Sequence, residues 1–132
     1  MIYALDSNII SYMFKGDADI KLRYRQAIEG GNDVVIPPMV FYEVQRGLLA
    51  RRMNKRLVEF DELCQNALNV EFDMPVWQRA AQISALLYQQ GRPIEDADIL
   101  IAAYCLVNDF TLVTNNTRHF ERVDELKIVN WK

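Results

Sequence analysis

The chain has 132 residues, of which 51% are hydrophobic and 25% are charged, a composition typical of one globular domain with a buried core. Its 15 Lys and Arg against 18 Asp and Glu give a formal net charge of -3, so no overall basic character marks it as a nucleic-acid-binding protein. The longest apolar run, residues 99–107, is much shorter than the roughly 20 residues needed to cross a bilayer. We therefore expect a single domain over residues 1–132 and no membrane span.

The first residues and the cysteines argue against further classes of protein. Residues 1–6 contain no basic lead, long apolar stretch or cleavage site, so the sequence predicts a cytoplasmic protein rather than a secreted one. Cys64 and Cys105 are far apart and lie in apolar helical patterns, with no neighbouring Cys or His. We expect buried free thiols rather than a zinc site or a disulfide.

Short apolar runs alternate with longer segments of helical periodicity along the chain. The runs predict strands at residues 2–5, 34–36, 70–72, 111–114 and 128–129, the third being the weakest. The longer segments predict helices at residues 9–14, 20–28, 39–51, 56–68, 75–88 and 96–108, with Asp19 capping the second. Short, wholly apolar strands separated by helices are paired in parallel and covered on both faces. The predicted fold class is therefore α/β, a three-layer α/β/α sandwich with a central parallel sheet of about five strands.

Three acidic residues fall where a parallel sheet forms its ligand sites, beyond the carboxyl ends of the strands. Asp6 ends the first strand, Glu43 lies in the first turns of the helix after the second strand, and Asp98 lies in the first turn of the last long helix. Each alone is explained as an acid that favours a helix N-terminus. Together they would repel one another in a partly desolvated crevice, an arrangement that a divalent cation stabilises.

Oxygen ligands without a Cys or His cluster favour Mg²⁺ or Mn²⁺ over zinc. Such an ion suits hydrolysis of a phosphodiester, because it polarises the phosphate and activates water. No serine nucleophile motif and no glycine-rich phosphate loop is present, and His119 is the only histidine.

Four short motifs carry a resemblance to a known family. They are IYALDSN at residues 2–8, EVQRG at 43–47, PIEDADILIAA at 93–103, and LVTNN at 112–116 leading to Phe120. In this order and at these separations they resemble PIN-domain proteins and, more narrowly, VapC-type toxins of toxin–antitoxin pairs. The likeness extends over essentially the whole chain.

The resemblance implies a PIN-like fold and a metal-dependent endoribonuclease that cuts a structured RNA. It implies that Asp6, Glu43 and Asp98 bind Mg²⁺ or Mn²⁺. It also implies that Ser7 and Thr114 place their hydroxyls beside these carboxylates. A fourth acid common in the family is replaced here by Asn116, which can orient a water but adds no charge. Glu121 is the alternative source of that charge.

RNA binding is predicted beside the acidic residues. Arg46, Arg51 and Arg52 belong to a segment with no acid, and they would contact the phosphate backbone. Arg46 is the one expected to face the site, and Gly47 has no side chain to crowd it. Solvated helix faces are the alternative explanation of these arginines.

The resemblance also implies a VapB-like antitoxin as partner and a homodimer. A tRNA-like molecule is the leading target, and ribosomal and messenger RNA stay open. The alternative function is a PIN-like RNA- or protein-binding module with weakened catalysis, which Asn116 favours. A phosphoacceptor receiver domain has a similar topology, but its adjacent acids and its lysine after the last strand are absent.

Overall fold

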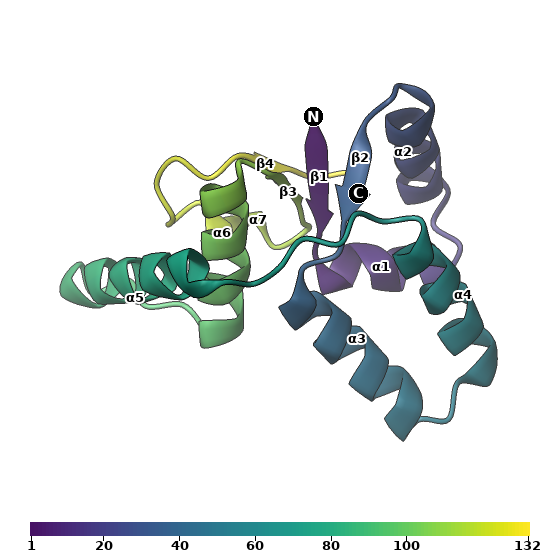
Figure 1. The fold of residues 1–132 in the computed structure, drawn as a ribbon, viewed down its shortest axis with the longest axis horizontal. Helices are drawn as coiled ribbons and strands as arrows, with labels where there is room; N and C mark the ends of the chain where they lie inside the picture. The colour runs from purple at the N-terminus through teal and green to yellow at the C-terminus, as the bar shows by residue number, and fades with distance from the viewer.

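Four parallel strands form the central sheet, in the order β2-β1-β3-β4. The computed structural model describes all residues, 1–132. The strands are β1 (Ile2–Leu5), β2 (Asp33–Val35), β3 (Thr111–Val113) and β4 (Ile128–Val129). The helices are α1 (Ser7–Phe14), α2 (Ala18–Glu29), α3 (Pro38–Ala50), α4 (Asn54–Gln65), α5 (Met74–Gln89), α6 (Asp96–Asn108) and α7 (Thr117–Phe120). In Figure 1, α1 to α4 lie to one side of the sheet and α5 and α6 to the other, which confirms the predicted α/β fold around a parallel sheet.

The sheet has four strands instead of the predicted five, because residues 70–72 do not form a strand. The segment after α4 pairs with β2 only at Leu68, which forms one isolated parallel bridge with Val35. Beyond it, the backbone oxygen of Val70 accepts a hydrogen bond of 2.6 Å from the Tyr104 hydroxyl, and the ring of Phe72 stacks on the Tyr104 ring. Val70 and Phe72 are therefore partly buried by packing against α6 rather than by pairing in the sheet.

Several helix ends differ from the sequence prediction. α1 begins at Ser7, with Asp6 as its N-cap, and α2 is capped by Asp17 rather than by Asp19. α4 begins at Asn54 and stops at Gln65, three residues before the predicted end. The four-residue helix α7 was not predicted, since so short a segment shows no apolar periodicity.

The core is one cluster of 27 buried hydrophobic residues that covers both faces of the sheet. α6 supplies six buried residues to it, and its neighbour α5 supplies four. Cys105 is a buried free thiol whose pKa is raised by burial, and Cys64 is a half-buried free thiol, so both cysteines are unpaired as expected. None of the helices is both long and apolar enough to span a bilayer.

Parallel pairing brings the carboxyl ends of all strands to one edge of the sheet. Tyr3 of β1 is in register with Val34 of β2 and with Thr111 of β3. The segments that leave this edge are therefore neighbours in space. α1 follows β1, α3 follows β2, and the turn that contains Thr114 follows β3.

Candidate active site

Asp6 lies at the centre of this edge with its side chain fixed by three donors. It is only 4% exposed. Oδ1 accepts a hydrogen bond of 2.8 Å from the backbone N of Ser7, while Oδ2 accepts from Thr114 Oγ1 at 2.7 Å and from Asn8 Nδ2 at 3.2 Å. Burial raises the pKa of Asp6 and the charge of Asp98 adds to this, whereas the hydrogen bonds from Thr114 and Ser7 oppose it.

Thr114 is a fully buried polar residue directly after β3. Its backbone N donates to the Val129 oxygen of β4 at 3.0 Å, which extends the sheet by one residue. Its hydroxyl donates to Asp6 and accepts from the backbone N of Asn116 at 2.9 Å. The hydroxyl is thereby oriented toward the carboxylate, as a group that fixes Asp6 must be.

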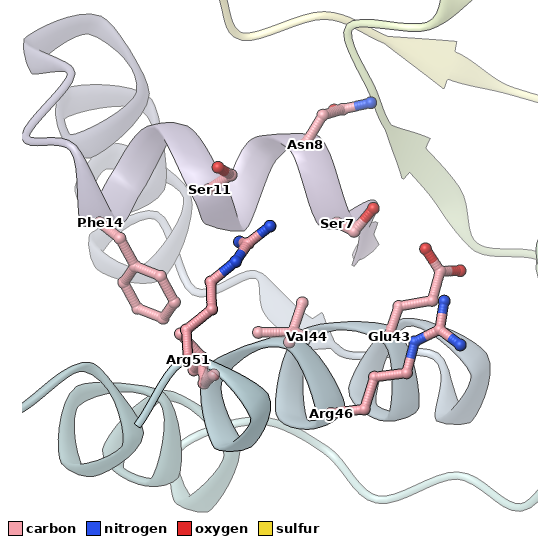
Figure 2. A pocket seen from close by; sticks show the side chains of 10 residues that line it. Ser7, Asn8, Ser11, Phe14, Glu43, Val44, Arg46 and Arg51 are labelled. Atoms are coloured by element: carbon pink, nitrogen blue, oxygen red, sulfur yellow. The ribbon is translucent and has the colours of Figure 1, made fainter. Parts of the chain in front are cut away.

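Glu43 reaches the same edge from the first turns of α3. Its Oε1 atom is buried and has no hydrogen-bond partner. Burial raises the pKa of Glu43, the charges of Asp6 and Asp98 raise it further, and Arg46 opposes the shift. In Figure 2 its carboxylate and the Ser7 hydroxyl occupy the same end of the pocket, on the facing helices α3 and α1.

Asp98 lies in the first turn of α6, and its side chain is 15% exposed. Oδ2 is 3.1 Å from Nδ1 of His119 in α7, and the side-chain amide of Asn116 is 3.1 Å from the same ring nitrogen. The roles depend on the tautomer of His119: an Nδ1 that carries a hydrogen donates to the Asp98 carboxylate, whereas an Nδ1 without one accepts from the Asn116 amide. Sequence reasoning did not connect His119 with the acidic residues. The spacing of Asn116 and His119, one helical turn apart just after β3, is the signal that points to this contact.

The fourth negative charge is missing from this edge. Asn116 occupies the start of α7, where its backbone contacts Thr114 and its side chain contacts His119. Glu121 is exposed at the other end of α7, and no hydrogen bond or ion pair joins it to the carboxylates. The structure therefore gathers Asp6, Glu43 and Asp98, and Glu121 is not part of the set.

The three carboxylates are near enough for their charges to act on one another, yet no three acidic, His or Cys side chains surround a common point as metal ligands do. Like charges repel when no cation lies between them, so side chains that await an ion stand apart. The buried Oε1 of Glu43 is the feature that fits a cation, because it has no hydrogen-bond partner and the nearby charge of Arg46 does not offset the effects that raise the pKa of this carboxyl. An all-oxygen donor set suits Mg²⁺ or Mn²⁺.

A polar pocket of about 330 Å³ continues from Glu43 between α1 and α3. Arg46 and Arg51 line it, and Figure 2 shows Arg46 beside Glu43 and Arg51 reaching from the end of α3 toward Ser11. The Arg46 guanidinium also lies over the Tyr42 ring, 5.2 Å from its centroid. Arg52, predicted to act with these two, lies outside the pocket lining, in the turn after α3 with a φ of 54°.

Comparison with known proteins gives a consistent family. Residues 3–126 match the model of the PIN domain. The chain is 27% identical to Ribonuclease VapC2 of Rickettsia felis over 99% of this chain and 98% of the relative. It is 30% identical to the tRNA(fMet)-specific endonuclease VapC of Shigella flexneri over 98% of this chain and 97% of the relative.

Solved structures of high similarity come from toxin–antitoxin complexes. The chain is similar to one in VapBC2 from Rickettsia felis bound to a DNA fragment from its promoter, with a TM-score of 0.92, 26% identity and all of both chains covered. It is also similar to one in the DNA-bound VapBC of Salmonella typhimurium, with a TM-score of 0.85, 25% identity, and 100% and 99% of the chains covered.

Proposed function

The chain belongs to the PIN-domain family, and on that basis we propose that it is the toxin of a toxin–antitoxin pair and a Mg²⁺- or Mn²⁺-dependent endoribonuclease. The names of its relatives, ribonuclease and endonuclease VapC, support RNA cleavage. The observation that carries the proposal is the buried, unpartnered Oε1 of Glu43, at an edge of the sheet where the charges of Asp6 and Asp98 also raise the pKa of this carboxyl. A bound cation would offset both effects.

Asp6, Glu43 and Asp98 would hold the ion. The bound metal would supply Lewis acidity toward a phosphate oxygen and lower the pKa of a water. Asp6 is already oriented for metal binding, since hydrogen bonds fix both of its carboxylate oxygens. Its raised pKa and that of Glu43 belong to carboxylates whose negative charge is poorly compensated in the protein alone, which strengthens the attraction for a cation.

The polar residues around the carboxylates act as positioning groups in this proposal. Thr114 fixes Asp6, and His119 restrains Asp98 through the contact of 3.1 Å. Asn116 donates its backbone N–H to the Thr114 hydroxyl, and its side-chain amide lies 3.1 Å from Nδ1 of His119, so it would contribute order instead of the charge of a fourth acid. The Ser7 hydroxyl lies beside Glu43, whose pKa it lowers as a hydrogen-bond donor, and it would orient a water or a phosphate oxygen there.

The substrate in this proposal is a structured RNA cut in an unpaired loop, with a tRNA-like molecule as the leading target. The Shigella flexneri relative, whose name specifies tRNA(fMet), supports this choice. The arginines that line the pocket next to Glu43 supply positive charge for the phosphate backbone. In this proposal their position would let a chain of net charge -3 bind RNA.

The proposed partners are a VapB-like antitoxin and a second copy of the chain, in the cytoplasm. The complexes of VapB and VapC among the similar structures support an antitoxin partner.

The second candidate is a PIN-like module that binds RNA or protein and has weakened catalysis. Two observations favour it, namely Asn116 in place of an acid and the absence of a preformed group of three metal ligands. The two candidates differ in one measurable property, which is whether the chain cuts RNA.

The test is incubation of the purified chain with total cellular RNA in Mg²⁺, in Mn²⁺ and in EDTA. We expect discrete cleavage products with either metal and none in EDTA or with Asp6→Asn. Asp19→Asn, an exposed carboxylate of α2, is the control and should cut like the wild type. Cleavage that survives EDTA or Asp6→Asn refutes the metal mechanism, while RNA left intact under all conditions favours the binding module.

A further inference from the structure

The pocket between α1 and α3 is longer than a site for one phosphate needs to be. Its α3 wall carries Glu43, Gly47 and the C-cap residue Arg51, which are spaced four residues apart and so follow one face of the helix. Eight residues of helix span about 12 Å. The pocket therefore runs from the carboxylate of Glu43 at one end to Arg51 at the other, and a scissile phosphate would fill only the first end.

The far end of the pocket has the chemistry of an anion site. Arg51 has no ion-pair partner in the protein, and its guanidinium reaches toward Ser11 of the opposite helix in Figure 2. Guanidinium groups bind phosphate through two parallel hydrogen bonds, and serine hydroxyls commonly add a third. The two residues face each other across a space that is open to solvent.

Gly47 keeps the two ends of the pocket connected. A Cβ atom built there meets nothing within 4 Å, and the φ of Gly47 is not positive, so neither the packing nor the backbone requires glycine. Glycine inside a helix lowers the stability of that helix. A larger side chain would project into the pocket between Glu43 and Arg51, so the glycine leaves a continuous channel along α3.

From this arrangement we propose that the pocket holds an unpaired stretch of the RNA strand. Arg51 and Ser11 would bind a second phosphate, and the absence of a side chain at Gly47 would leave room for the strand between the two ends. This inference rests on the proposed function. The volume of about 330 Å³ is that of a site for a small ligand, so it accepts one or two nucleotides of a single strand and no duplex. The channel would therefore select unpaired RNA at some distance from the bond that is cut.

The test measures RNA binding without cleavage. A fluorescein-labelled single-stranded oligouridine is titrated in the presence of EDTA with the full chain, and its anisotropy is followed over a series of salt concentrations. We expect Arg51→Ala to weaken binding about tenfold and to lower the salt dependence by about one ion. Arg52→Ala is the matched control, because this neighbouring arginine lies outside the pocket and should leave the salt dependence unchanged.

A second pair of variants tests the channel itself. Gly47→Leu should weaken binding of the single strand while raising the Tm, since it improves helix propensity and blocks the pocket. Ala50→Leu adds the same side chain to an exposed position of α3 outside the pocket and should leave binding intact. Loss of binding with a maintained Tm cannot come from unfolding.

Several results would overturn the inference. They are wild-type binding by Gly47→Leu, equal effects of the Arg51 and Arg52 variants, and absence of oligouridine binding by the wild type. Variants that bind RNA normally but no longer copurify with a partner chain would assign the pocket to that partner and also overturn it. Cleavage in Mg²⁺ or Mn²⁺ is assayed separately, so a chain that binds through the channel and does not cut refutes only the nuclease proposal.

Discussion

Replacing Glu43 by Gln is expected to stabilise the metal-free protein while abolishing its proposed activity. Oε1 of Glu43 is buried without a partner, and burial together with the charges of Asp6 and Asp98 raises the pKa of this carboxyl. Burial and the two neighbouring negative charges both disfavour the ionised form of Glu43 in the folded protein. Glutamine keeps the shape of the side chain and removes the charge.

The expected gain follows from the cost of the unpartnered oxygen. A buried polar group without a partner costs about 1–3 kcal/mol. The neutral amide still lacks a partner at that position, so only part of this cost is recovered, and we expect a gain of about 1 kcal/mol at about pH 7.5. For a domain of this size, that corresponds to a rise of about 3–5 °C in Tm.

The gain must depend on pH. The pKa of a glutamate in the unfolded chain is about 4.3, and the folded-state pKa of Glu43 lies above its usual value. Between these two values the folded protein binds more protons than the unfolded chain, so the free energy of unfolding falls as pH rises through this window. The difference between Glu43→Gln and wild type should therefore be full at neutral pH and vanish below about pH 4.

Urea unfolding followed by circular dichroism in EDTA measures both quantities. Glu59→Gln replaces an exposed carboxylate of α4 and is the control. It should leave the free energy of unfolding unchanged both at neutral pH and at about pH 4. Adding Mn²⁺ at neutral pH should reverse the order, because only the wild type has the full ligand set. The reasoning is refuted if Glu43→Gln is less stable than wild type in EDTA, or if its gain is the same at about pH 4.

Three further substitutions test the neighbours of the carboxylates and the core. Thr114→Val removes the buried hydroxyl of the 2.7 Å hydrogen bond and should cost about 1–3 kcal/mol in urea unfolding, whereas Thr114→Ser should restore most of it. His119→Ala should weaken Mn²⁺ binding about 10–100-fold in calorimetry with Tm unchanged, and an unaltered affinity would remove this residue from the proposed site. Tyr104→Phe loses the 2.6 Å bond to Val70 and should cost about 1 kcal/mol with RNA cleavage intact; reduced cleavage would mean that residues 70–72 position the site.

The acidic edge could be predicted from the sequence because it follows from topology. Once the strands are parallel, the segments after β1 and β2 must be neighbours; Asp6 directly follows β1, and Glu43 lies in the first turns of α3, the helix after β2. The alternation of apolar runs and helices was sufficient to predict parallel pairing. The position of Thr114 against Asp6 follows from the same register.

Features that depend on side-chain packing were beyond the sequence pattern. Residues 70–72 have the composition of a strand, and only the hydroxyl and ring of Tyr104 explain why they pack on α6 instead. The contact between His119 and Asp98 depends on the one-turn helix α7, which is too short to have a periodicity. The three arginines look equivalent in sequence, but α3 ends at Ala50, and Arg52, in the turn beyond it, does not line the pocket.

The hydrogen bond between Asp6 and Thr114 joins residues 108 positions apart, so this carboxylate is oriented only when two distant parts of the chain have come together. β1 lies between β2 and β3 in the sheet, and the edge that holds Asp6 is complete only when β3 has paired with β1. A partly folded chain without β3 therefore has the first carboxylate but not the hydroxyl that orients it. On the proposed function, activity would appear only with the complete sheet.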